Sequence, residues 1–382
     1  MHNANRPFAG PLSLAVRGLL ACLLAGILLA CGGLADRGAA PDLPGRPDPG
    51  FNRLFTRSGP GWTGGDGTLS LALPDGRTLW LFGDSFLGTV RPDGSRPLDS
   101  PLIRNCLVIQ DGAHLETRHG GTLRHPEAFL VPEDPEAWYW PGAGTHAGRR
   151  AQIFYHRYRQ VSEGIWGWAW DGTVIAVLTL PELAVQRVTE LPTAHGVVYG
   201  AALLERHTWV YIFGTEWREG RHHLHVARAP RHDLAARWQF WTGARWASEP
   251  AASRAILAGV GRQFGVVALA GGLGLVTMDL RQPFSNRIVL YSAQEPTGPW
   301  RGPVAIYQAP EADREVAAYN AFVHPQFAGP DGQLISYNLN HVHNPDALYA
   351  DAALYRPRFI RADLARLIDR PTPSHRKDIP WP

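Results

Sequence analysis

The sequence predicts an all-β fold, a five-bladed β-propeller, from a repeated strand, its spacing and the composition. The repeated strand is apolar and aromatic and ends in small or polar residues. Successive copies lie roughly 60 to 70 residues apart, a period typical of four-stranded propeller blades. The 41 Gly, 32 Pro and 14 Trp residues also indicate a turn-rich β protein. Tandem immunoglobulin-like sandwiches are the alternative, but they require shorter and more regular spacings. The five copies begin at Leu79, Ala151, Trp209, Leu273 and Gln333.

Residues 1–30 are predicted to be a signal peptide. Arg6 and Arg17 supply positive charge, and residues 18–30 form an apolar run shorter than the about 20 residues that a membrane span needs. The run ends at Ala30-Cys31, which resembles the processing site of bacterial lipoproteins. We therefore expect export and anchoring at the cell envelope through a lipid on Cys31. An ordinary cleaved signal and an uncleaved anchor are the alternatives.

Residues 31–50 are predicted to be a flexible linker because they are rich in Gly, Pro, Asp and Ala and have no apolar period. The propeller is expected over residues 51–370. Its last part, residues 355–360 followed by Leu364, Leu367 and Ile368, is expected to close the ring and to end in a short helical cap. Residues 371–382 then form a C-terminal tail.

Charge and cysteine content limit the classes of partner. The net charge is +3 and the basic residues are scattered, so no nucleic-acid surface is expected. Cys22 and Cys31 lie in the N-terminal segment, which leaves Cys106 alone in the body and excludes an internal disulfide after export. We expect a monomer that meets the membrane only through its lipid anchor.

Two glycine-flanked acids suggest a catalytic pair. Asp66 lies in Trp62-Thr63-Gly64-Gly65-Asp66-Gly67, and Asp84 follows the β run 79–82 and Gly83. Glycine has no Cβ, so a ligand or a backbone can come close to the neighbouring acid. Hydrolysis of a glycosidic bond needs one protonated acid and one ionised carboxylate. Glu216, at the end of the equivalent strand of another blade, is the third candidate carboxylate. Alternatively, Asp66 and Asp84 are ordinary turn residues and Glu216 is an exposed strand end.

Eight further residues are predicted to contact a sugar. Aromatic rings suit the flat apolar face of a sugar, and amide and imidazole groups can bind its hydroxyls. The alternative is that these aromatic residues pack in the core or staple a turn, and that the polar ones satisfy buried backbone groups near the tunnel. The eight residues are Trp62, Asn105, Tyr139, Trp140, Tyr199, His324, Asn338 and Asn340.

Other chemistries find less support. His222, His223 and His225 have no evident further ligand, so solvated histidines are favoured over a zinc site. No G-x-S-x-G motif, P-loop or dinucleotide fingerprint occurs. No cofactor is therefore predicted from the residues themselves.

The run from Trp62 to Phe86, the turn Trp138-Tyr139-Trp140-Pro141-Gly142 and the segments YNAFVHPQ and LISYNLN resemble a bacterial family known as a domain of unknown function, over roughly residues 55 to 362. Its relatives include endo-D-arabinanases, and its architecture is similar to that of the arabinanase and xylosidase clan. The resemblance implies a five-bladed propeller, glycoside hydrolysis by carboxylates of the first blades and a calcium ion on the axis.

The resemblance therefore implies a cell-surface glycoside hydrolase that cleaves an arabinan-type or related polysaccharide. Ala143 stands where the family pattern has an acid, which favours the alternative of a carbohydrate-binding propeller that has lost activity. A metal-dependent lactonase or phosphotriesterase is a third possibility, and it would require a tunnel cation held by several carboxylates or asparagines.

Overall fold

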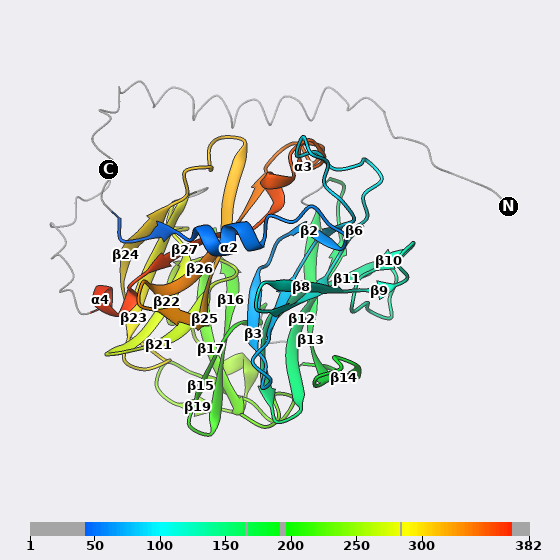
Figure 1. Ribbon diagram of the computed structural model, residues 1–382. Helices are drawn as coiled ribbons and strands as arrows, with labels where there is room; N and C mark the ends of the chain where they lie inside the picture. Colours follow the sequence, from blue (N-terminus) through cyan, green and yellow to red (C-terminus); the bar gives the residue numbers. More distant parts are fainter. Residues whose placement is uncertain (1–42, 165–166, 192–195, 283–284, 369–382) are drawn as a thin grey trace, which may run out of the picture. The chain divides into compact units, whose positions relative to one another are not determined.

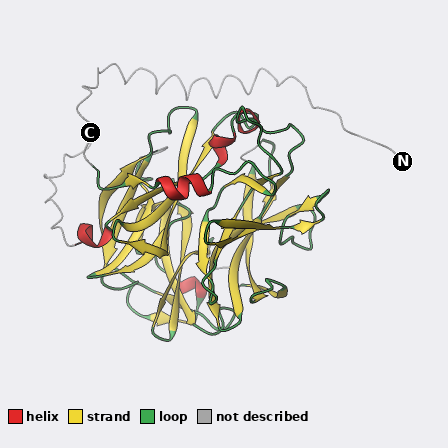
Figure 2. Ribbon diagram, viewed as in Figure 1, coloured by secondary structure: helices red, strands yellow, loops and turns green. Residues whose placement is uncertain are grey.

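The computed structural model describes residues 43–368, except 165–166, 192–195 and 283–284. Strands dominate the ribbon, and the helices are few and short (Figures 1 and 2). The strands form five antiparallel sheets of four or more strands, which we number as blades one to five.

The strands of each blade are given from the first to the last position in its sheet. Blade one contains β3 (Leu69–Ala72), β4 (Thr78–Phe82), β7 (Cys106–Asp111) and β8 (His114–Arg118). Blade two contains β11 (Ala137–Ala147), β12 (Arg150–Gln160), β13 (Trp168–Thr179) and β14 (Val185–Glu190). Blade three contains β15 (Val198–Arg206), β16 (Trp209–Arg218), β17 (Arg221–Pro230), β18 (Gln239–Trp241) and β19 (Trp246–Ala247), with β20 (Leu257–Val260) also paired to β17. Blade four contains β21 (Gly265–Leu269), β22 (Gly272–Met278), β23 (Arg287–Ala293) and β24 (Arg301–Gln308). Blade five contains β25 (Val316–Gly329), β26 (Gly332–His341), β27 (Arg358–Ala362) and β1 (Arg46–Pro47).

The first strands of the blades contact one another in a closed cycle, from β3 to β11, β15, β21, β25 and back to β3. These are therefore the innermost strands of a five-bladed propeller, and the predicted fold class is confirmed. The strand that repeats in the sequence is the second strand of each blade: β4, β12, β16, β22 or β26. We call the end of the propeller where the innermost strands begin the front face.

Smaller elements lie outside the blades. A three-stranded sheet contains β2 (Trp62–Gly65), β5 (Ser85–Leu87) and β6 (Leu102–Ile103), and a short hairpin contains β9 (Gly120–Gly121) and β10 (Pro126–Glu127). The helices are α2 (Pro49–Leu54), α3 (Ala347–Ala350) and α4 (Leu364–Ile368), and the 3-10 turns are η1 (Pro250–Ala252) and η2 (Ala352–Tyr355). Helix α4 is the predicted C-terminal cap, and its buried Leu364 and Leu367 pack on the core between blades four and five.

Apolar clusters fill the interfaces between neighbouring blades. Between blades two and three, for example, Phe154 and Ile175 pack with Ile212 and Phe240. Cys106 is buried as a free thiol. Burial of such clusters is the main stabilising contribution expected for a domain without disulfides among its described residues.

The ring closes through the N-terminal part of the chain. Strand β1 pairs with β27 as the outermost strand of blade five. Asp48 caps α2 by accepting a hydrogen bond from the backbone N–H of Phe51, and it also accepts one from Arg361 at 2.7 Å. Residues 43–50 therefore belong to the propeller, so the prediction of a linker up to residue 50 is wrong at its C-terminal end. The cause is the long-range pairing with β27, which a composition rich in Pro and Gly conceals.

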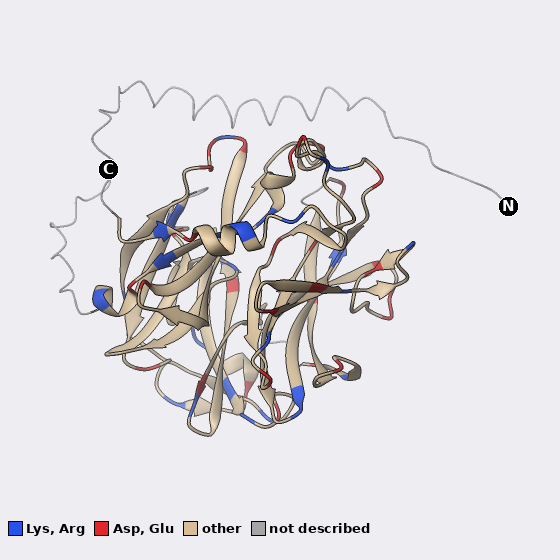
Figure 3. Ribbon diagram, viewed as in Figure 1, with Lys and Arg blue, Asp and Glu red and all other residues tan. Residues whose placement is uncertain are grey.

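Charged residues of both signs are distributed over the described strands and loops rather than gathered on one side (Figure 3). Within the part of the chain that the structure describes, no helix has the length and apolar character required to cross a membrane. The signal peptide, Cys31 and the C-terminal tail from residue 371 lie outside the described residues.

Candidate active site

Asp66 and Asp84 lie side by side at the front face, in two turns that are joined through their backbones. Asp66 follows β2 and Asp84 connects β4 to β5. The N–H of Asp66 donates to the carbonyl of Asp84 at 3.2 Å, and the N–H of Gly83 donates to the carbonyl of Asp66 at 2.8 Å. A Cβ at Gly83 would lie 2.7 Å from Oδ1 of Asp66. Only glycine therefore fits beside the Asp66 carboxylate without displacing it.

Asp66 is half-buried among hydroxyl donors. The Tyr319 hydroxyl donates to Oδ2 at 2.9 Å, and the Tyr355 hydroxyl also hydrogen-bonds the carboxylate. Burial and the negative charge of Asp84 raise the pKa of Asp66 to about 7, although the two tyrosine hydroxyls oppose this rise by favouring the ionised form. Asp66 is therefore largely protonated below neutral pH.

Asp84 has partners that favour its ionised form. Trp140 Nε1 donates to Oδ1 at 2.7 Å, and Arg104 Nη1 forms an ion pair with Oδ2 at 3.0 Å. Burial raises the pKa of Asp84 above its ordinary value, although the charge of Arg104 and the two hydrogen bonds oppose this rise. The two aspartates thus lie in contrasting environments, Asp66 beside neutral hydroxyls and Asp84 beside a cation. Contrasting environments allow one carboxyl group of a site to be protonated while the other is ionised.

An aromatic wall adjoins Asp84, formed by Trp138, Trp140, Tyr158 and Trp168. The Trp140 ring lies 4.5 Å from that of Tyr158 and 5.0 Å from that of Trp168, measured between centroids. Arg104 stacks over Trp138 at 4.4 Å. Trp140 and Trp168 are half-buried, so part of each ring can meet a ligand.

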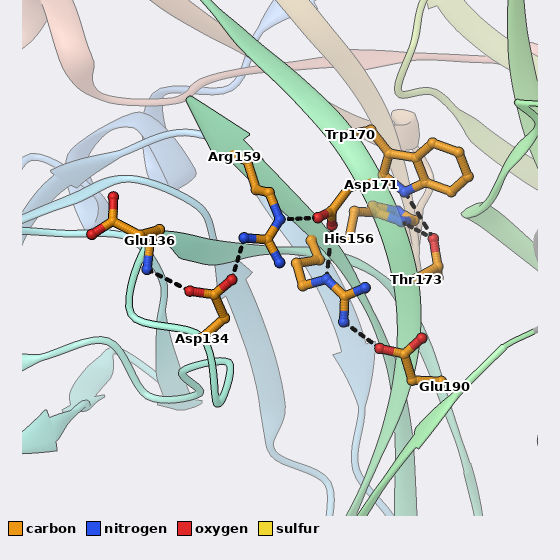
Figure 4. Close-up of polar contacts among 9 residues, drawn as sticks. Asp134, Glu136, His156, Arg159, Trp170, Asp171, Thr173 and Glu190 are labelled. Atoms are coloured by element: carbon orange, nitrogen blue, oxygen red, sulfur yellow. Dashed lines mark hydrogen bonds and ion pairs between the residues drawn. The ribbon is translucent and has the colours of Figure 1, made fainter. Parts of the chain in front are cut away.

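A network of ion pairs between side chains connects the strands that carry this wall (Figure 4). Arg157 and Arg159, which flank Tyr158 on β12, both bind Asp171, at a bulge in β13. They also bind Glu190 and Asp134, respectively. The network fixes β12 against β13, and with it the position of Tyr158.

Comparison with known proteins adds the family. A family model described as "Domain of unknown function (DUF5005)" matches residues 48–364. The chain belongs to the DUF5005 family. The predicted membership of a domain-of-unknown-function family is thereby confirmed.

Solved structures resemble this DUF5005 domain. A protein of Bacteroides ovatus, assigned provisionally as a hydrolase, superposes with a TM-score of 0.74 at 21% identity, over 86% of this chain and 93% of that one. The GH43_1 enzyme of Xanthomonas citri in complex with xylose gives a TM-score of 0.46 at 13% identity, over 83% and 89% of the two chains. The exo-beta-1,3-galactanase 1,3Gal43A of Clostridium thermocellum gives 0.44 at 12%, over 78% and 58%. A search of curated proteins gives no match.

In this DUF5005 domain Glu216 does not contact the aspartate pair. Its Oε2 atom lies 3.1 Å from Arg218 Nη1 and 3.4 Å from His225 Nε2. Nδ1 of His225 contacts Ser253 Oγ at 2.9 Å, and the same hydroxyl contacts that of Tyr199 at 2.7 Å. Glu216 thus ends a separate polar chain in blade three.

Four residues predicted to contact a sugar are core residues instead. Trp62 is 2% exposed and packs on Phe82 at 4.6 Å, because its strand β2 faces the cluster between blades five and one. Tyr139 and Tyr199 are buried in the clusters on either side of blade two. Asn105 uses both ends of its amide on backbone groups, donating to the carbonyls of Leu130 and Tyr139 and accepting from the N–H of Leu130. For these four the alternative of a structural role is correct.

His324 is also structural. Nδ1 contacts Ser70 Oγ of blade one at 2.7 Å and Nε2 contacts Ser336 Oγ of blade five at 2.9 Å, so both ring nitrogens are engaged. Burial lowers the pKa of His324 to about 3, which keeps the ring neutral. The predicted sugar contact of His324 is therefore wrong.

The two asparagines of β26, Asn338 and Asn340, hydrogen-bond residues next to or in contact with Asp66. Asn338 is 1% exposed and donates to Thr68 Oγ1 at 2.9 Å, just after Asp66, so it cannot reach a sugar as predicted. Asn340 is half-buried and hydrogen-bonds Tyr319, the partner of Asp66. Of the eight predicted residues, Trp140 binds Asp84 directly and Asn340 is linked to Asp66 through Tyr319.

An axial calcium ion, which takes 6–8 oxygen ligands including carbonyl oxygens and water, stays a prediction. The described residues contain no group of three or more His, Cys, Asp or Glu side chains that could hold a metal. The histidines at 222, 223 and 225 are included in that result. Asn338 Oδ1 is buried and lacks a hydrogen-bond partner among the described residues, but it is a single oxygen.

The sequence analysis did not assign Tyr319, Tyr355 or Arg104, which complete the site. Tyr319 precedes Asn320, whose φ of +53° accompanies a bulge in β25 between Tyr319 and Phe322. Bulges re-aim side chains and are frequent beside active sites. The only sequence signal was the presence of Tyr319 in the segment YNAFVHPQ, which carries the family resemblance but no role.

Proposed function

We propose that this protein is a glycoside hydrolase in which Asp66 is the proton donor and Asp84 the ionised carboxylate. The observation that carries the proposal is the pairing of two half-buried aspartates from adjoining turns, one bound by tyrosine hydroxyls and the other by an arginine. Paired carboxylates of unlike protonation are what cleavage of a glycosidic bond requires.

The roles follow from the surroundings of each acid. Asp66, with a pKa of about 7, holds a proton that it can give to the glycosidic oxygen as the bond to the leaving sugar breaks. Asp84 is ion-paired with Arg104, which favours its ionised form, and this carboxylate can stabilise the positive charge that develops on the sugar ring. Trp140 holds the Asp84 carboxylate through Nε1 and offers the exposed part of its ring to a sugar.

The proposed substrate is a polysaccharide of arabinan type or a related one, on the strength of the family resemblance. The test is release of reducing sugar from a panel of arabinans, xylans and galactans. Asp66→Asn and Asp84→Asn should each reduce the rate by about a hundred- to ten-thousandfold. Asp75→Asn is the matched control, because Asp75 lies in the turn between β3 and β4 of the same blade and pairs only with Arg77 among the described residues. It should leave the rate unchanged.

A non-catalytic carbohydrate-binding propeller is the second candidate function, favoured by Ala143. Ala143 lies at the bulge in β11 and packs against the cluster between blades one and two. Binding of one or more polysaccharides without release of sugar from any would select this function and refute the hydrolase.

We also infer that the protein is exported and anchored by a lipid on Cys31. Incorporation of labelled fatty acid into the wild type, and its loss in Cys31→Ala, would support this. Equal labelling of both proteins, or of neither, would contradict it.

A further inference from the structure

Arg262 lies at the front face, in the segment between β20 and β21, and reaches the aromatic wall. Its Nη2 donates to the Tyr158 hydroxyl at 2.7 Å. The guanidinium carbon lies 4.9 Å from the centre of the Tyr158 ring and 5.2 Å from that of Trp168. Stacking on two rings fixes the plane of the guanidinium and leaves its remaining N–H groups for another acceptor.

Arg262 differs from three other arginines near the front ends of the strands. Arg104, Arg218 and Arg281 pair with Asp84, Glu216 and Asp279 at 3.0, 3.1 and 2.7 Å, respectively. Among the described residues, by contrast, the contacts of Arg262 are a hydroxyl and two aromatic rings, and none is a carboxylate. Its charge is therefore held in place without a counter-ion from the described part of the chain.

The neighbouring imidazoles respond to this charge. Burial, together with the positive charge of Arg262, lowers the pKa of His156 to about 3 and that of His222 to about 4. The two rings are thus neutral at physiological pH. The positive charge of Arg262 therefore favours an anionic ligand.

A chain of contacts connects Arg262 to the acid pair. Asp84 is bound by Trp140, the Trp140 ring packs on that of Tyr158, and the Tyr158 hydroxyl accepts from Arg262. Two aromatic side chains therefore separate the guanidinium from the Asp84 carboxylate. A sugar lying along this wall would bring a group on a neighbouring unit, rather than on the unit being cleaved, towards Arg262.

We propose that Arg262 binds the carboxylate of a uronic acid unit, so that the polysaccharide recognised by this site is acidic. The planar guanidinium fork matches a carboxylate in two parallel hydrogen bonds, and the half-buried rings of Trp140 and Trp168 support the adjoining sugar faces. This inference rests on the proposed glycoside hydrolase, because it places the acidic unit beside the bond that Asp66 and Asp84 act on.

The test compares an acidic polysaccharide with its own neutral derivative. Polygalacturonate and glucuronoxylan are each used native and after reduction of their carboxyl groups to alcohols, which keeps the backbone and removes the charge. Binding is measured by retardation in native gels containing each polymer, and cleavage by release of reducing ends. The wild type should bind at least one native polymer about ten- to a hundredfold more tightly than its reduced form, the range expected for hydrogen bonds to a charged group.

Substitutions then assign the preference to Arg262. Arg262→Gln should bring the ratio of the affinities for the native and the reduced polymer close to one. Arg262→Lys should keep part of the preference for the native polymer, because lysine retains the charge but not the planar guanidinium. The control is Arg228→Gln. Arg228 stacks over Trp209 and Trp246 at 4.3 and 4.4 Å, a similar contact within blade three, and its loss should leave the ratio unchanged. Thermal unfolding of each variant checks that the fold persists.

The outcomes separate the two proposals. Equal affinity of the wild type for native and reduced polymers, no binding to either native polymer, or a preference that survives in folded Arg262→Gln would overturn the role of Arg262. If cleavage of neutral polymers accompanies such a result, the hydrolase stands and only the acidic substrate is refuted. A preference lost in Arg262→Gln without cleavage of any polymer would instead support recognition of an acidic glycan by a non-catalytic propeller.

Discussion

If the proposed glycoside hydrolase activity is present, removing the Tyr319 hydroxyl should extend it to higher pH. In Tyr319→Phe, Asp66 loses the hydrogen bond that the hydroxyl donates to Oδ2 at 2.9 Å. That bond favours the ionised form, so its loss raises the pKa of Asp66. A hydrogen bond to a charged group is worth about 1.5–3 kcal/mol, and 1.36 kcal/mol corresponds to one pKa unit, so the pKa should rise from about 7 to about 8–9.

A proton donor works only while it is protonated, so the alkaline limb of the rate profile should move upward with this pKa. The assay is kcat as a function of pH on the best polysaccharide of the screen. Tyr211→Phe, on β16 of blade three, is the control and should leave the limb in place, because Tyr211 packs on Trp246 away from the acid pair. An alkaline limb that stays fixed or moves downward in Tyr319→Phe would refute the assignment of Asp66 as the donor.

Three further predictions concern the same turns. In the folded protein the pKa of Asp66 is about 7, against an ordinary 3.8, so ionisation of Asp66 lowers the free energy of unfolding by on the order of 4 kcal/mol above pH 7 and by little at pH 4. Asp66→Asn should therefore raise the melting temperature at pH 8 but not at pH 4. An equal change at both pH values would contradict this. Arg104→Gln removes the cation that favours ionised Asp84, so the acid limb of the rate profile should move to higher pH; an unmoved limb would count against Asp84 as the working carboxylate. Gly83→Ala should lower kcat by at least about tenfold through displacement of Asp66, whereas Gly329→Ala, whose added methyl would come no closer than 3.8 Å to another atom, should not.

The periodic part of the fold could be predicted from the sequence. Each blade repeats the same pattern of apolar strands and turns, so five units were visible without any knowledge of contacts. Asp66 and Asp84 were also identifiable, because the glycines that let their turns pack together lie directly beside them in the chain. Local sequence determines both features.

Features that depend on contacts between distant residues could not be predicted in this way. Trp62 and Trp140 are both tryptophans near glycine, yet one packs on Phe82 in the core and the other binds Asp84. The direction of each ring depends on the packing of its blade against the next, which no local pattern records. Tyr319 reaches Asp66 across 253 positions of sequence, and only closure of the ring brings them together.

The pairing of β1 with β27 also determines when the molecule can be completed during synthesis. The outermost strand of blade five is made first and its partner, which ends at Ala362, is made nearly last. Until that strand leaves the ribosome, the earlier blades form an open arc whose last apolar face has no neighbour to cover it. Such non-local closure is slow and exposes the nascent chain to aggregation, so assistance from chaperones is most valuable at this stage.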